Sequence, residues 1–251
     1  MPISTLMPAR RISMTALMRM ILYMLAALMV TGPACAWDQS VLTDVRFSPD
    51  GRYFSFVEYT EPEAEERGFA SLYVIDAASD TWAAATPRRV SLEGEGASGK
   101  KALAELQNGS LDLIQRFGLR DGDPPIVPFL EIDRGAPYDR RHQVFVPALK
   151  SKLVLVQRKA MSAQPCGKDV PSAIDFRLVL SGRETIRLAD YARRLPRSRG
   201  CAIGYDIAAA FLHKTAERTV LAVLIGVFTR GWEGSNRQLI AVTKVLPPSR
   251  F

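Results

Sequence analysis

The sequence TVLAVLIGVF at residues 219–228 decides the fold. Two further apolar runs flank it, YDIAAAFL at 205–212 and LIAVTKV at 239–245. Strands that are apolar almost throughout are typical of a sheet with both faces buried. We therefore expect these three segments to be the central strands of the protein.

A second group of strands is predicted near residue 50. Residues 41–47 and 53–59 flank the sequence Ser48-Pro49-Asp50-Gly51, which is typical of a tight turn because Pro presets φ and Gly accepts positive φ. Residues 69–76 form the third strand of this antiparallel meander. One face of the first strand is expected to hold Val41, Val45 and Phe47.

The middle of the chain is expected to be helical over residues 100–117, with a break at 108–110 and Ser110 as the cap of the second part. Residues 118–141 read as a loop. Further strands are expected at 142–146, 152–159, 174–180 and 185–188, with a short helix at 187–194 as an alternative to the last. The fold class is mainly β, with antiparallel sheets in a sandwich or partial propeller and a short helical insertion around 100–117.

Residues 1–36 have the three parts of a secretory signal peptide. Arg10, Arg11 and Arg19 precede the apolar run MILYMLAALMV at 20–30, and ACA at 34–36 fits the signal peptidase site. The sequence leaves open the general and twin-arginine export routes. We expect residues 37–251 to form a single secreted β-rich domain, with two subdomains meeting near 118–141 as the alternative. The expected location is the periplasm or the exterior.

Charge and cysteine content agree with export. Residues 37–251 hold 30 basic and 26 acidic residues, a net charge of +4, which is too mild to indicate nucleic-acid binding. Cys166 and Cys201 are the cysteines that remain after cleavage, and an even pair in an oxidising compartment predicts a disulfide.

No motif predicts a specific reaction. GEGASGKK at 94–101 resembles a phosphate loop, but Lys101 stands where a Ser or Thr would hold magnesium. We expect a flexible glycine loop there and no nucleotide. No cofactor or metal site is predicted. The enzymatic alternative is a periplasmic hydrolase that uses carboxylates and His213.

The candidate binding site is the loop TRGWEGSNR at 229–237, because Trp and Arg are favoured at binding hot spots. Its residues are Arg230, Trp232, Glu233, Asn236 and Arg237. The expected partner is an envelope protein or a glycan, with membrane contact only during export. The alternative is that Trp232 folds back on the core. The predicted function is a non-catalytic binding or envelope-associated module.

Two resemblances follow from these motifs. VRFSPDGRYFSFV at 45–57, continued by SLYVID at 71–76, resembles a WD40-like propeller repeat. Together with PRSRGC at 196–201 and LIGVFTRGWEGSNRQLIAVT at 224–243, these segments resemble predicted secreted bacterial proteins with domain of unknown function 2259. That resemblance implies a proteobacterial periplasmic protein and brings no known catalytic or binding residues.

Overall fold

The structure is a computed structural model that describes residues 38–60, 66–131, 140–161, 166, 172–192, 195, 199–231 and 235–247. These residues belong to one compact unit. The predicted signal peptide lies outside the described residues. The described part is mainly β and forms three antiparallel sheets, as the sequence predicts.

The first sheet has six strands, and we call it the six-stranded sheet. Its order is β4-β3-β2-β1-β6, and β5 also pairs with β3. The strands are β1 (Ser40–Phe47), β2 (Tyr53–Thr60), β3 (Arg67–Asp76), β4 (Thr81–Trp82), β5 (Arg88–Glu93) and β6 (Arg120–Asp121). The meander predicted for β1, β2 and β3 is confirmed by their antiparallel pairing.

Two further sheets follow in the chain. The four-stranded sheet has the order β10-β9-β8-β7, and the central sheet has the order β11-β12-β13. The four-stranded sheet comprises β7 (Gln143–Val146), β8 (Ser151–Ala160), β9 (Ala173–Ser181) and β10 (Thr185–Ala189). A short 3₁₀ helix, η1 (Pro147–Leu149), lies between β7 and β8. The central sheet comprises β11 (Gly204–Lys214), β12 (Thr219–Arg230) and β13 (Ser235–Leu246). Residues 185–189 therefore form a strand, as first predicted. The alternative prediction of a helix over residues 187–194 is wrong for residues 187–189.

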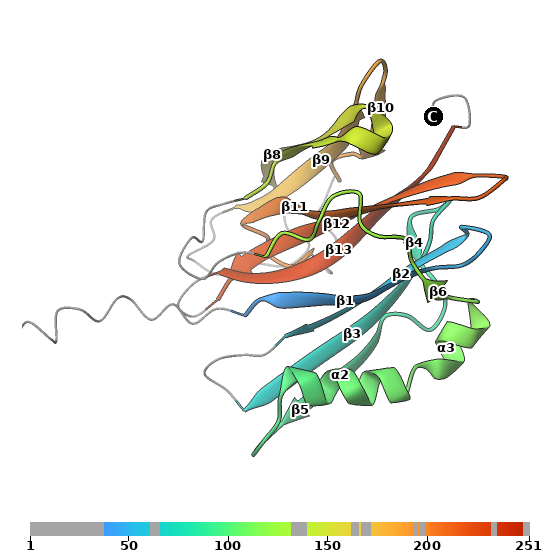
Figure 1. The fold of residues 1–251 in the computed structure, drawn as a ribbon. Coiled ribbons are helices and arrows are strands. Elements are labelled where there is room, and N and C mark those ends of the chain that lie inside the picture. Colours follow the sequence, from blue (N-terminus) through green and yellow to red (C-terminus); the bar gives the residue numbers. More distant parts are fainter. Residues whose placement is uncertain are drawn as a thin grey trace, which may run out of the picture. The chain divides into compact units, whose positions relative to one another are not determined.

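The central sheet is buried on both faces, which confirms the prediction from its apolar runs. Side chains alternate across a strand, so neighbours along β12 enter different cores. Leu221, Val223 and Ile225 pack with the four-stranded sheet, whereas Ala222 and Leu224 pack with the six-stranded sheet. The three sheets are thus stacked as layers (Figure 1).

Two helices cover the outer face of the six-stranded sheet (Figure 1). They are α2 (Gly99–Asn108) and α3 (Leu111–Arg116), which confirms the predicted helical insertion and its break. The Ser98 side chain caps α2 by accepting a hydrogen bond from the Lys101 backbone N–H at 3.3 Å. Ser110 occupies the N-cap position of α3, as predicted, but its side chain makes no capping hydrogen bond.

A β-bulge in β1 overturns the predicted apolar face of that strand. Two residues, Asp44 and Val45, lie opposite one residue of β2, and Asp44 has a φ of 47°. An extra residue in one strand shifts the alternation of side chains beyond it. Val45 and Phe47 therefore share the inner face with Leu42, and Val41 lies on the other face with 41% of its surface exposed.

Both edges of the central sheet are covered. Along β11, Val127 and Ala210 exchange backbone hydrogen bonds. Along β13, three backbone N–H groups that point away from β12 find separate acceptors. Arg237 N–H donates to the Asp38 carbonyl at 2.9 Å, Leu239 N–H to the Glu58 carboxylate at 2.8 Å, and Thr243 N–H to the Asp80 carboxylate at 2.7 Å.

The predicted disulfide between Cys166 and Cys201 is present. The three stacked sheets give no support to the resemblance of residues 45–76 to a propeller repeat. Within the described part of the chain, neither helix combines the length and the apolar character needed to cross a bilayer.

Candidate functional site

The structure separates the residues of the predicted binding loop. Trp232 and Glu233 lie outside the described residues. Arg230 is exposed at the end of β12, and the Asn236 side-chain oxygen accepts a hydrogen bond from the Asp38 backbone N–H at 3.1 Å. Arg230 and Asn236 thus lie at the same end of the β12–β13 hairpin, whereas Arg237 points into the protein with 2% of its surface exposed.

Arg237 is part of a buried ion pair. Its Nη2 lies 3.0 Å from both carboxylate oxygens of Asp206, and its Nη1 donates to the Leu130 carbonyl at 2.9 Å. Asp206 also accepts from the Gly226 backbone N–H at 3.1 Å. A Cβ at Gly226 would stand 2.2 Å from Asp206 Oδ1 and 2.4 Å from Arg237 Nε, so the glycine makes room for the pair. Arg237 is placed to hold three strands together.

His213, the candidate base of the hydrolase alternative, has one polar contact. Its Nδ1 lies 3.4 Å from Asp123 Oδ2, and its ring stacks on Phe47 with centroids 4.8 Å apart. Its Nε2 is buried and has no hydrogen-bond partner among the described residues. A general base needs a hydroxyl nucleophile within hydrogen-bond reach. The described residues bring a carboxylate to His213 without such a hydroxyl.

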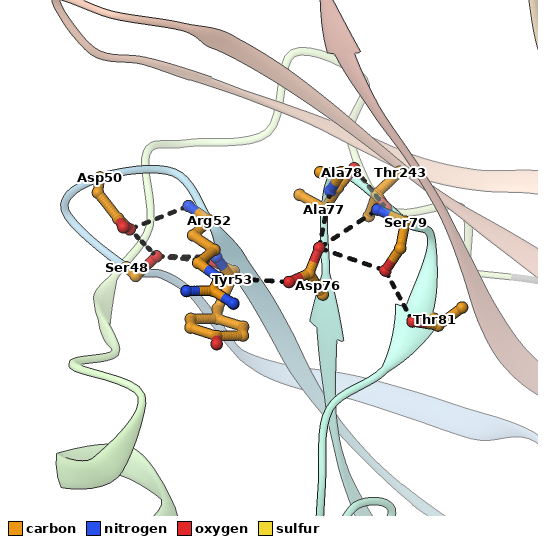
Figure 2. Close-up of polar contacts among 10 residues, drawn as sticks. All are labelled: Ser48, Asp50, Arg52, Tyr53, Asp76, Ala77, Ala78, Ser79, Thr81 and Thr243. Atoms are coloured by element: carbon orange, nitrogen blue, oxygen red, sulfur yellow. Dashed lines mark hydrogen bonds and ion pairs between the residues drawn. The ribbon is translucent and has the colours of Figure 1, made fainter.

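A group of acidic and hydroxyl side chains near residue 50 closes two turns (Figure 2). Ser48 Oγ donates to Asp50 Oδ1 at 2.6 Å and accepts from the Tyr53 backbone N–H at 2.8 Å, while the Arg52 N–H donates to Asp50 at 3.0 Å. The hydrogen bond from Ser48 lowers the pKa of Asp50. Arg52 joins this turn to the next through Asp76 at 3.3 Å. These groups satisfy one another, which confirms the turn predicted at residues 48–51.

The glycine loop at 94–101 is similarly self-contained, because Lys101 Nζ donates to the Gly96 carbonyl at 2.5 Å. Among the described residues, no three His, Cys, Asp or Glu side chains are grouped so that they could hold a metal ion.

The candidate site is a cavity of about 210 Å³ between the two helices and the outer face of the six-stranded sheet. Aliphatic side chains form most of its wall, which is the usual character of a small-molecule site. The lining residues are Asp44, Arg46, Val57, Leu72, Leu106, Gln107, Ser110, Leu111 and Ile114.

The polar residues of the cavity come from the β1 bulge and from α2. Gln107 Nε2 donates to Asp44 Oδ2 at 2.5 Å, and Arg46 lies 3.7 Å from Asp44 and 3.6 Å from Asp121. One arginine thus stands between two carboxylates, which leaves this group with a net negative charge. Ser110 adds a hydroxyl that is buried and has no hydrogen-bond partner among the described residues.

The turn that carries Ser110 is fixed from the neighbouring strand. The Arg88 guanidinium donates to the Gly109 carbonyl and to both oxygens of Asp112, at 2.5 and 3.0 Å. These bonds lower the pKa of Asp112. The break between α2 and α3 is therefore held in one position beside the cavity.

Sequence reasoning did not find this site. Its wall combines β1, β2 and β3 with two short helices, and only their packing brings these residues together. Asp44 and Arg46 alternate with Val45 and Phe47, which is the ordinary pattern of a half-buried strand, so they gave no signal of the site.

Comparison with known proteins agrees with the secretion predicted from the sequence. No curated protein matches the chain. A family model described as predicted secreted protein, DUF2259, matches residues 63–244, which include both helices, the four-stranded sheet and most of the central sheet, while β1 and β2 precede the match. The chain therefore belongs to the DUF2259 family of predicted secreted proteins.

Proposed function

We propose that this secreted protein is a non-catalytic binding module of the periplasm and that the cavity beneath α2 and α3 is its ligand site. The observation that carries the proposal is the cavity wall. Val57, Leu72, Leu106 and Ile114 offer an apolar surface, and Asp44 adds a polar group. A pocket of this kind, with few polar groups, is the usual form of a small-molecule site.

The volume limits the ligand. Pockets for drug-sized molecules measure roughly 300–1,000 Å³, whereas an engineered cavity of about 150 Å³ takes up benzene. The cavity of about 210 Å³ lies between these cases. The ligand is accordingly a compact apolar molecule with the bulk of one or two small rings or of a short acyl chain. Asp121 does not line the cavity, and the charges of its lining residues Asp44 and Arg46 balance each other. A neutral molecule is therefore preferred to an ion.

The test is binding of indole, followed by saturation-transfer NMR and by titration of backbone amide shifts. We expect saturable binding, with shift changes confined to α2, α3 and the facing strands. Ser110→Leu places an aliphatic side chain in the cavity and should abolish binding. Ser110→Ala keeps the cavity open and is the matched control, which should bind within about fivefold of the unaltered protein because a hydrogen bond is worth only about 1 kcal/mol. Equal binding by all three proteins, or none by the unaltered one, would overturn the proposal.

The Cys166–Cys201 disulfide supports a compartment outside the cytosol, because disulfides persist in oxidising environments. Of these compartments we propose the periplasm. Fractionation of cells followed by non-reducing gels tests this. We expect the processed chain in the periplasmic fraction without free thiols, and recovery of the reduced chain in the cytosol would contradict it.

The β12–β13 hairpin remains a second proposed contact, for an envelope protein or a glycan. It is supported by exposed Arg230 beside Asn236 and by Trp232 in the sequence between them. Recovery of partners from the periplasm by the unaltered protein and by Trp232→Ala tests it. Identical partners for both would remove Trp232 from the proposal.

The hydrolase alternative retains one supporting observation, the contact of 3.4 Å between His213 and Asp123. Screening with ester and glycoside substrates, with His213→Phe as the control, separates it from a binding module. Activity that disappears in that variant would favour the hydrolase.

A further inference from the structure

The outer face of the four-stranded sheet has an apolar centre that faces solvent. Side chains alternate along each strand, so the face opposite the core collects every second residue. Val154 lies directly opposite Val179, and Val156 and Phe145 lie on the same face. Val156 is 46% exposed and Phe145 is 55% exposed. An antiparallel sheet with one solvated face normally shows polar residues there, so this apolar centre requires an explanation.

Basic residues surround the apolar centre on the same face. Lys152 lies opposite Phe145, Arg187 opposite Val179, and Arg177 opposite Val156. Arg158 follows two positions after Val156 on β8 and therefore shares its face. Each apolar side chain at the centre thus has a cation beside it.

The charge of the face is positive even with its carboxylates counted. Among the described residues, Asp175 and Asp190 are the acidic residues in contact with it. Asp175 is fully buried against Arg199 at 2.7 Å, and Asp190 accepts from Arg177 and Arg187 at 2.8 Å each. With the buried pair of Arg199 and Asp175 left out, Lys152, Arg158, Arg177 and Arg187 are four cations against the one carboxylate of Asp190. Arg177 and Arg187 remain 39% and 62% exposed, so the solvent reaches this charge.

A tyrosine stiffens one side of the basic rim. The guanidinium of Arg158 lies 3.8 Å from the centre of the Tyr191 ring, and that of Arg177 lies 4.8 Å from it. Contacts of this kind hold arginines in place without neutralising them. The cations around the valines therefore keep their positions in the absence of a partner.

We propose that this face docks on an anionic phospholipid surface. This contact is separate from the cavity, and it is made by the folded protein and not during export. Basic side chains around an exposed apolar centre match such a surface, because headgroup phosphates attract the cations while the apolar residues enter the boundary with the acyl chains. Lys152, Arg158, Arg177 and Arg187 contact the phosphates, and Phe145 and Val156 are the residues that insert.

The test is co-sedimentation of the purified protein with vesicles. We expect binding to vesicles of phosphatidylcholine mixed with phosphatidylglycerol, and little binding to phosphatidylcholine alone. Each cation near an anionic surface contributes about 1 kcal/mol, which is about fivefold in affinity. Lys152→Glu with Arg187→Glu should therefore weaken binding by at least about 25-fold. Phe145→Ser should weaken it severalfold without changing the charge, and added salt should release the protein.

Lys100→Glu with Arg116→Glu is the matched control, because it makes the same change in net charge on α2 and α3. Circular dichroism confirms that every variant is folded. Equal binding by the two double variants would show that net charge and not this face is responsible, and would overturn the proposal. Absence of a preference for anionic vesicles, or unchanged binding of Phe145→Ser, would overturn it as well.

Discussion

Replacing Arg237 by Met should remove a large part of the stability of this protein. The substitution keeps the apolar part of the side chain and deletes the guanidinium, which contacts both oxygens of Asp206 at 3.0 Å. Asp206 is fully buried and, among the described residues, would retain only the hydrogen bond from the Gly226 N–H. A charge left buried after the loss of its partner typically costs about 3–5 kcal/mol. We expect the free energy of unfolding to fall by about 4 kcal/mol, against a total of about 5–15 kcal/mol for a typical domain.

Urea unfolding followed by circular dichroism, with the disulfide intact, measures this loss. Asp206→Asn combined with Arg237→Met removes the buried charge, because the amide is neutral and its oxygen still accepts from Gly226. The double variant should recover about 2 kcal/mol relative to Arg237→Met. Arg187→Met is the surface control, since Arg187 is 62% exposed, and it should cost less than about 1 kcal/mol. A loss below about 1 kcal/mol in Arg237→Met, or no recovery in the double variant, would refute this account of the buried pair.

Three further outcomes are expected. Replacing Cys166 and Cys201 together by Ser should lower the free energy of unfolding by about 4 kcal/mol, because the disulfide closes a loop with a sequence separation of 35. An unchanged midpoint of urea unfolding in this variant would contradict the prediction. Burial raises the pKa of Glu58, so the folded state holds its proton to higher pH than the unfolded state. The free energy of unfolding should therefore fall as pH rises from the ordinary carboxyl pKa of 4.5 through the raised pKa of Glu58. In Glu58→Gln, urea unfolding at a series of pH values should show a smaller dependence of this free energy on pH. His213→Phe keeps the stacking on Phe47 and should change the free energy of unfolding by less than about 1 kcal/mol. Indole binding should be unchanged in this variant, and loss of binding would implicate His213 in the ligand site.

Most of the fold could be predicted because its sheets follow simple hydrophobic periods. The segments 205–212 and 219–228 are apolar at nearly every position, and this pattern alone predicts burial on both faces. The turn at 48–51 was equally accessible, since Pro and Gly each determine a local backbone angle there. The disulfide followed from the count of cysteines, because export leaves two of them in an oxidising compartment.

The errors arose where one residue changed the geometry of its neighbours. Asp44 adopts a positive φ and introduces the bulge that moves Val41 to the other face, and no propensity predicts this for an aspartate in a strand. Ser110 occupies the position of a cap, but its turn is held by Arg88 from β5. Arg237 looked like a surface residue because its partner, Asp206, lies 31 positions away. The cavity was inaccessible for the same reason, since its wall is assembled from five separate segments.

The acceptors along the outer edge of β13 impose an order on folding. They come from Asp38, Glu58 and Asp80, whereas β13 ends at Leu246, and the bond between Leu239 and Glu58 joins residues 181 positions apart. A contact of this range forms slowly, because a long loop must close before it contributes any stability. The central layer thus stays incomplete until the final strand is available. Until β13 is available, the acceptors of Asp38, Glu58 and Asp80 lack their partners, so the amino-terminal half of the chain cannot complete its core before the carboxyl-terminal strand is present.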